Sequence, residues 1–186
     1  MEASEYGSFL GVEMEISKDQ IRAGDIVLCK RNPNDRLAGV LSAVLKVFYP
    51  RWDRYGWHMA FITRWHNGKN DWVVCEATWP KVRQNYLSLM GEFRAYRWLD
   101  KEPDYEDQIK PFLKWCLGCP YDVWKYIWAI ACGLLHRLFR INLGRWDNDE
   151  YMCWELVEEF AEHMGKPFTV KNITLLLPDI QKILES

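Results

Sequence analysis

The chain has 186 residues, of which 49% are hydrophobic and 15% aromatic, and its 24 basic and 26 acidic side chains give a formal net charge of −2. This composition excludes a chain that is disordered throughout, because such chains are poor in aromatic and aliphatic residues. The balanced charge also lacks the basic footprint of a nucleic-acid-binding protein, so we expect no nucleic-acid partner. The length suits one domain with a substantial core.

Residues 1–20 form an acidic segment, which we expect to be a weakly structured arm before a single domain at 21–186. The segment lacks the basic start and apolar run of a signal peptide, which favours a cytoplasmic protein with free thiols. The longest apolar run, 126–135, is shorter than the roughly 18–20 residues that span a bilayer, so we expect no integral membrane segment.

The first half of the domain alternates strand and helix patterns. Residues 21–29 predict a turn and a short strand, and apolar residues at helical spacing predict a helix over 37–48. Two β-rich runs, 57–65 and 71–78, flank Asn67-Gly68 and predict a hairpin. Pro80 is expected to end the second strand.

The second half is mainly helical in pattern. A third candidate strand covers 92–99, and helical spacing follows over 105–117, 123–141 and 152–164, with a short helix after Pro178. A strand, a helix, a group of strands and then helices indicate the α+β class. The helix over 123–141 is aromatic with a basic end, so weak contact with a membrane surface is an open alternative to core packing.

Cys153 is the first candidate for chemistry because it begins a predicted helix directly after a polar loop. The unpaired N–H groups and positive dipole at a helix N-terminus favour a thiolate and could hold an oxyanion. The alternative is a buried structural cysteine, since Cys153 shares a face with Leu156, Val157 and Phe160. Position alone favours this alternative.

His58 and Glu76 are the other candidates, one on each strand of the predicted hairpin. His58 stands at a strand entrance and could act as a general base, although a histidine there is usually an ordinary, partly exposed residue. Glu76 lies in an apolar run, where orienting a histidine would offset the cost of burying a carboxylate. An equally good explanation for a glutamate in this run is that the Glu76 side chain is exposed to solvent at a sheet edge. With the turn centred on Asn67-Gly68, residue 58 should pair with 76 or 77.

Cys116 and Cys119 form a CxxC motif, which can bind zinc or carry redox chemistry. A structural zinc site needs four ligands, and no second CxxC or HxxxH accompanies this pair. A redox motif would need a βαβ context. We therefore expect no metal and no cofactor.

Several segments, taken in order, resemble the YiiX-like branch of the permuted NlpC/P60 (papain-like) superfamily and, more distantly, the lecithin:retinol acyltransferase-like proteins. They are Gly24-Asp25-Ile-Val-Leu, Trp57-His58-Met-Ala-Phe-Ile, Glu76-Ala77, Phe93-Arg-Ala-Tyr-Arg97, Gly118-Cys-Pro-Tyr121-Asp122 and Met152-Cys153-Trp-Glu155-Leu-Val. The resemblance covers roughly residues 21–165.

The resemblance implies a permuted papain-like fold, with a small antiparallel sheet packed against helices. It also implies that Cys153 is the nucleophile, His58 the base and Glu76 the third, polar member of a catalytic site. The implied activity is that of a cysteine hydrolase or acyltransferase acting through an acyl-enzyme on a peptide, a peptidoglycan fragment or a lipid acyl group.

One departure from the family pattern keeps other functions open. The family usually has serine after the nucleophile, where this chain has Trp154. A catalytically inactive binding or structural protein on the same scaffold is therefore one alternative. A lipid acyltransferase at a membrane surface is another.

Overall fold

A computed structural model describes residues 15–30, 58–122, 135 and 151–167. The predicted helices over 37–48 and 123–141 (apart from residue 135), the short helix after Pro178 and the arm before residue 15 lie outside the described residues. Within these limits the α+β class is confirmed, because a mixed set of strands and helices builds one antiparallel sheet with helices on it.

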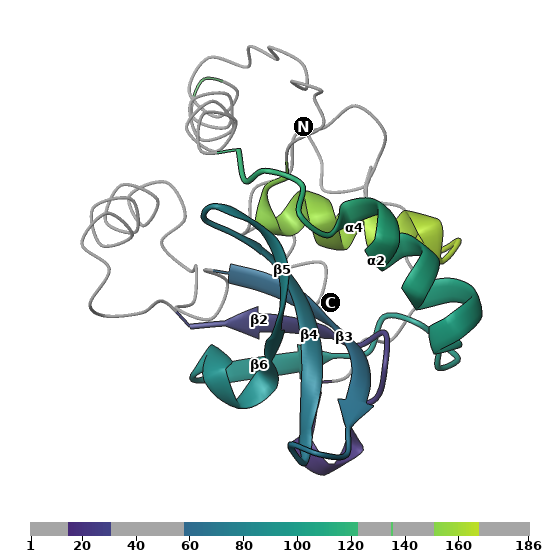
Figure 1. Cartoon of the computed structure of the whole chain (residues 1–186). Coiled ribbons are helices and arrows are strands. Elements are labelled where there is room, and N and C mark those ends of the chain that lie inside the picture. The colour runs from purple at the N-terminus through teal and green to yellow at the C-terminus, as the bar shows by residue number, and fades with distance from the viewer. Residues whose placement is uncertain (1–14, 31–57, 123–134, 136–150, 168–186) are drawn as a thin grey trace, which may run out of the picture.

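The sheet has six strands in the order β1-β6-β2-β3-β4-β5, and every neighbouring pair is antiparallel. The strands are β1 (Glu15–Ile16), β2 (Ile26–Cys29), β3 (His58–His66), β4 (Asp71–Thr78), β5 (Lys81–Tyr86) and β6 (Phe93–Tyr96). Three single turns of helix complete the strand region: η1 (Lys18–Gln20), η2 (Leu87–Met90) and the π-helical η3 (Tyr105–Ile109). The helices α2 (Lys110–Cys116) and α4 (Cys153–His163) lie together over one face of this sheet (Figure 1).

Two strands were not expected from the sequence. Glu15–Ile16, assigned to the acidic arm, pairs with β6 as β1, so part of the arm belongs to the sheet. The second strand, β4, ends before Pro80 as expected, but a further strand, β5, begins directly after this proline and pairs with residues 73–78 of β4. Both unexpected strands are edge strands, and an edge strand carries polar side chains that hide the usual apolar pattern.

The β3–β4 hairpin has a different register from the expected one. His66 pairs with Asp71 around a four-residue loop, and a bulge between Ile62 and Arg64 then shifts the pairing so that Ala60 lies opposite Glu76. Continued by two residues, this register puts His58 opposite Thr78, so the expected pairing with 76 or 77 is wrong. Since side chains alternate along a strand, His58 and Glu76 are still diagonal neighbours on one face.

An aromatic cluster attaches the helices to the sheet. The ring of Phe160 from α4 stacks on Phe61 of β3 at a centroid distance of 3.8 Å, and Phe112 of α2 meets both rings edge-on. All three side chains are buried. Burial of such rings supplies much of the hydrophobic stabilisation of a domain of this size, so this cluster sets the position of α4 on the sheet.

The opposite face of the sheet carries a second apolar cluster. It comprises Ile16, Ile21, Val27, Cys29, Ala60, Ile62, Val74, Leu87 and Ala95. Because alternate residues of β2, β3 and β4 contribute to the two clusters, the central strands are apolar on both sides. This explains why β2 and the middle of β3 are continuous hydrophobic runs.

A turn before β2 is fixed by a buried carboxylate. Asp25 accepts hydrogen bonds from the backbone N–H of Arg22 and from the guanidinium of Arg97, which directly follows the neighbouring strand β6. Gly24 has a φ of +86°, and a Cβ there would lie 2.8 Å from Pro103 Cδ. The turn therefore requires glycine for both conformation and space.

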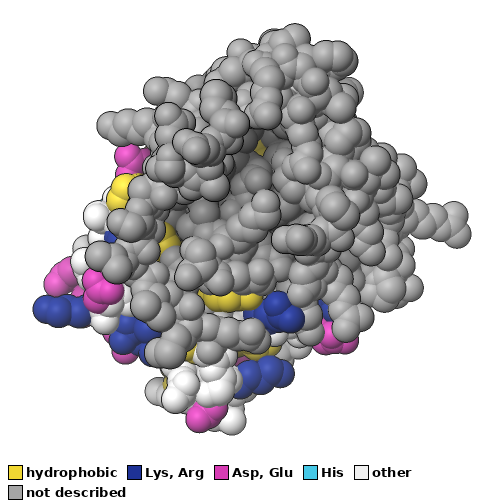
Figure 2. Space-filling view, turned by 180° about the vertical axis from the view of Figure 1, so that it is seen from behind, with side chains coloured by type: hydrophobic (Ala, Val, Ile, Leu, Met, Phe, Trp, Pro, Cys, Tyr) yellow, Lys and Arg dark blue, Asp and Glu magenta, His cyan; other side chains and the backbone are white. Residues whose placement is uncertain are grey.

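The described surface carries charges of both signs. From behind, Lys and Arg side chains alternate with Asp and Glu side chains along the rim of the described part (Figure 2). Among the residues that the structure describes, no helix has both the length and the hydropathy needed to cross a membrane.

Candidate active site

Cys153 occupies the first helical position of α4. Met152 precedes it in an extended conformation and ends the irregular segment, and the Glu155 carboxylate accepts the Met152 backbone N–H at 3.2 Å. This capping interaction fixes the point at which the helix begins. The Cys153 side chain is nevertheless buried, with 2% of the residue exposed.

His58 begins β3 and is joined to Glu76 on β4. The distance from His58 Nε2 to Glu76 Oε2 is 2.8 Å. The Glu76 side chain is buried, whereas about a quarter of the His58 side chain remains exposed, with a relative exposure of 23%. A buried carboxylate is costly unless it is hydrogen-bonded, and His58 supplies one of its partners.

The Cys153 side chain lies beside the same imidazole, where its interaction with the ring is among the causes that raise the pKa of His58. The structure thus brings together the three side chains singled out in the sequence, although 95 residues separate Cys153 from His58 (153 − 58).

The electrostatic interactions among Cys153, His58 and Glu76 favour the charged forms of His58 and Glu76. Burial alone would lower the pKa of His58, but the hydrogen bonds and charges of Cys153 and Glu76 outweigh it and raise the pKa to about 10. Burial would likewise raise the pKa of Glu76, yet its bonds to His58, Arg83 and Asn85 lower that pKa to about 2. The carboxylate is therefore ionised and the imidazole is held as imidazolium near neutral pH.

Two further side chains bind Glu76, and the sequence did not point to them. Arg83 Nε and Asn85 Nδ2, both from β5, donate to Glu76 Oε1 at 3.0 Å and 3.1 Å. They were missed because β5 was not expected after Pro80. The available signal in the sequence was that Arg83 and Asn85 are two residues apart, a spacing that places both side chains on one face of a strand. That strand pairs with the one that carries Glu76.

A second thiol lies beside the group. Cys29 on β2 pairs with His58 in the sheet ladder and is buried. Burial raises the pKa of the Cys29 thiol, and the negative charges of Glu76 and Cys153 raise it further. Cys29 is therefore held as a neutral thiol.

The CxxC cysteines lie away from this group. Cys116 is buried at the end of α2, where its thiol donates to the backbone carbonyl of Leu113 at 3.9 Å, and Cys119 is only partly buried. Residues 15–30, 58–122, 135 and 151–167 hold no cluster of three or more His, Cys, Asp or Glu side chains that could bind a metal ion.

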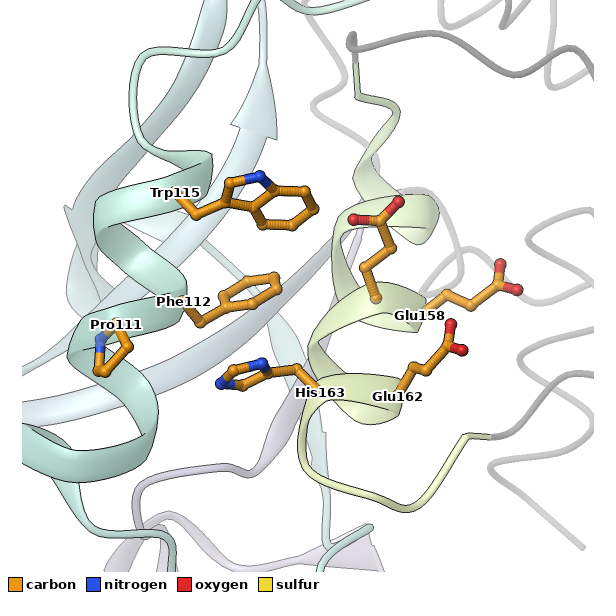
Figure 3. Close-up of a pocket in the computed structure, with 7 residues that line it drawn as sticks. Pro111, Phe112, Trp115, Glu158, Glu162 and His163 are labelled. Atoms are coloured by element: carbon orange, nitrogen blue, oxygen red, sulfur yellow. The ribbon is translucent and has the colours of Figure 1, made fainter.

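A cavity of about 580 Å³ opens between α2 and α4 (Figure 3). Phe112 and Trp115 face it from α2 and His163 from α4, while the carboxylates of Glu158 and Glu162 extend to the side away from α2. None of His58, Glu76 and Cys153 lines this cavity. It flanks the later turns of α4 and is separate from the candidate site at the start of that helix.

Comparison with known proteins gives no match on which an assignment could rest. No protein-family model matches the sequence, and a search of curated proteins finds none with significant similarity.

Proposed function

We propose that this protein is a cysteine-dependent hydrolase or acyltransferase of the permuted NlpC/P60 (papain-like) type. Cys153 would be the nucleophile, His58 the general base and acid, and Glu76 the group that orients His58. The observation that carries the proposal is the position of the His58 imidazole, which is bonded to the Glu76 carboxylate at 2.8 Å and has the Cys153 side chain beside it.

The proposed reaction uses groups that this chain provides. The Cys153 thiolate attacks the carbonyl carbon of an amide, ester or thioester, and the oxyanion lies near the first N–H groups of α4, which have no acceptor within the helix. His58 gives its proton to the leaving amine, alcohol or thiol, which leaves a thioester on Cys153. His58 then takes a proton from water or an acceptor nucleophile, which attacks the thioester, releases the acyl product and restores the Cys153 thiolate beside the protonated imidazole.

The pKa values support this assignment of roles. A thiol is a weak nucleophile until it is ionised, and an adjacent imidazolium is the usual means of holding a thiolate at neutral pH. The pKa of His58, raised to about 10, keeps the imidazole protonated under those conditions. The ionised Glu76 stabilises that positive charge.

A scaffold without catalysis is the second candidate, and the burial of Cys153 favours it. With 2% of the residue exposed and Trp154 next to it, the thiol is not open to a large substrate in this conformation.

If the protein is the proposed enzyme, its acyl substrate would be a peptide, a peptidoglycan fragment or a lipid. Liposome flotation tests the lipid acyltransferase alternative.

The decisive experiment is thiol labelling with a small electrophile such as iodoacetamide between pH 5 and 9, read by peptide mass spectrometry. If the proposal holds, Cys153 reacts at pH 5–6 at least tenfold faster than partly buried Cys119, because an imidazolium-paired thiolate persists where an ordinary thiol is protonated. His58→Gln should abolish that advantage.

Cys119 serves as the internal control because it is more accessible than Cys153 but is not paired with His58. In addition, Cys153→Ala should remove any hydrolytic or transferase activity and leave the fold intact. Labelling of Cys153 that is slower than that of Cys119 at every pH would instead identify a structural thiol and an inactive scaffold.

A further inference from the structure

We propose that Asn85 and Arg83, on the edge strand β5, are positioning residues that fix the Glu76 carboxylate so that His58 keeps one orientation and one protonation state. Their catalytic meaning rests on the proposed function. Their effect on His58 does not, because it is a property of the protein without substrate.

The two oxygens of the Glu76 carboxylate bond to residues on two different strands. Glu76 Oε1 accepts the bonds from Arg83 Nε and Asn85 Nδ2, while Oε2 faces His58 Nε2. A carboxylate is planar and rigid, so two donors that fix Oε1 also fix the direction of Oε2. The imidazole is therefore oriented from β5 through Glu76.

The register of β5 on β4 places both donors beside Glu76. Glu76 lies opposite Arg83 and Val74 lies opposite Asn85, so both donors project from the same face as Glu76. Asn85 is itself held, because its Oδ1 accepts the backbone N–H of Tyr86 at 2.9 Å. This bond leaves the Asn85 amide nitrogen to face Glu76.

The two donors contribute in different ways. Arg83 brings a positive charge, but half of its side chain is exposed, so solvent screens much of its effect. Asn85 carries no charge and supplies direction. Together with His58 they hold the pKa of Glu76 near 2 against the opposing effect of burial.

An alternative explanation is that these bonds only attach β5 to β4. The two explanations differ in one measurable quantity, the pKa of His58. If the donors act through Glu76, their loss lets the ionised carboxylate rotate away from His58 Nε2, and the imidazolium loses part of its stabilisation. If they only hold the edge strand, their loss lowers stability and leaves the His58 titration where it was.

The test is a titration of the imidazole by NMR on the full chain with ¹⁵N-labelled histidine, in which His58→Gln assigns the signal. We expect Asn85→Leu to lower the His58 midpoint by about one pH unit, a tenfold loss of proton affinity. Arg83→Gln should lower it less, and Arg83→Lys should retain more of the wild-type value than Arg83→Gln. In a Glu76→Gln background, Asn85→Leu should cause no further drop.

Lys81→Gln is the matched control, since Lys81 is a cation of the same strand for which no bond to Glu76 is found. An unchanged midpoint in Asn85→Leu and Arg83→Gln would overturn the proposal. So would a drop that persists in the Glu76→Gln background, or an equal drop in Lys81→Gln. If Asn85→Leu does not fold, half-exposed Arg83→Gln carries the test. A shifted His58 midpoint in a protein whose Cys153 is inert would retain this proposal and reject the enzyme.

Discussion

Glu76 shows how a single buried side chain can connect stability with the candidate chemistry. Its carboxylate is 4% exposed and would be unfavourable in an apolar strand without its three donors. Because those donors favour the ionised form, folding and ionisation of Glu76 are linked. The same linkage makes the role of this residue measurable without a substrate.

We expect acid to destabilise the protein partly through Glu76. The folded pKa, about 2, is below the ordinary value of 4.5, so the contribution of Glu76 is complete above pH 4.5 and is lost as the pH falls toward 2. Within this window the group contributes a slope approaching about 1.4 kcal/mol per pH unit. Urea denaturation between pH 2 and 5 should therefore show a shallower pH dependence in Glu76→Gln than in the wild type.

Glu106→Gln provides the comparison for that experiment, because Glu106 is exposed and pairs only with Lys110 one helical turn away. Its unfolding free energy should follow the wild-type curve. A Glu76→Gln curve parallel to the wild type would show that the carboxylate is not preferentially ionised in the folded state.

At the scale of elements, the packing of α4 on the sheet decides where Cys153 lies. The helix is held near its C-terminal end by the stacked pair of Phe160 and Phe61, two turns from the thiol, and at its start by the capping interaction of Glu155. A change in the aromatic cluster therefore alters stability and also the alignment of Cys153 with His58.

Phe160→Ala should lower the free energy of unfolding by about 3–5 kcal/mol, because it removes a buried ring and leaves a cavity between two other rings. Phe160→Leu should cost clearly less, since most of the volume is kept. Urea denaturation measures both. Equal losses in the two variants would mean that ring stacking, rather than filled volume, determines the stability of the cluster.

The turn before β2 permits a second test, which separates conformational strain from steric overlap. Gly24 and Gly118 have φ values of +86° and +89°, but a Cβ would collide with Pro103 and Leu99 only at Gly24. Alanine at Gly118 should cost about 1–2 kcal/mol from the conformation alone. Alanine at Gly24 should cost about 1–3 kcal/mol more. Thermal and urea denaturation of both variants check this, and equal losses would contradict the overlap.

The elements show what the sequence can and cannot predict. The β3–β4 hairpin followed from two apolar runs around Asn67-Gly68, and α4 followed from its apolar spacing. β5 did not, because the interval after Pro80 is mostly polar and its pairing is decided by β4 rather than by its own pattern. The bulge near Arg64 shifts the register of β3 on β4 and so decides which residue pairs with Glu76. No pattern in the local sequence predicts this bulge either.

The same reasons governed the candidate site. Cys153, His58 and Glu76 could be selected because each stands out in its own segment, as a helix start, a strand entrance and a charge in an apolar run. Arg83 and Asn85 could not, since polar residues on an edge strand are ordinary until their partner is known. Their relevance follows from tertiary pairing alone.

For the whole molecule, the central strands are apolar on both faces and the helices α2 and α4 cover only one of them (Figure 1). The site lies where the start of α4 meets the first residues of β3 and the end of β4. It therefore depends on parts of the chain that are far apart in sequence, and no isolated segment contains it.

This order of segments has a consequence for biosynthesis. The hairpin with His58 and Glu76 leaves the ribosome well before α4, so the nascent chain carries His58 and Glu76 for some time without Cys153. During the same interval Phe61 lacks the ring of Phe160 that covers it. At about 5–20 residues per second, the apolar surface of this hairpin therefore stays uncovered for several seconds during synthesis.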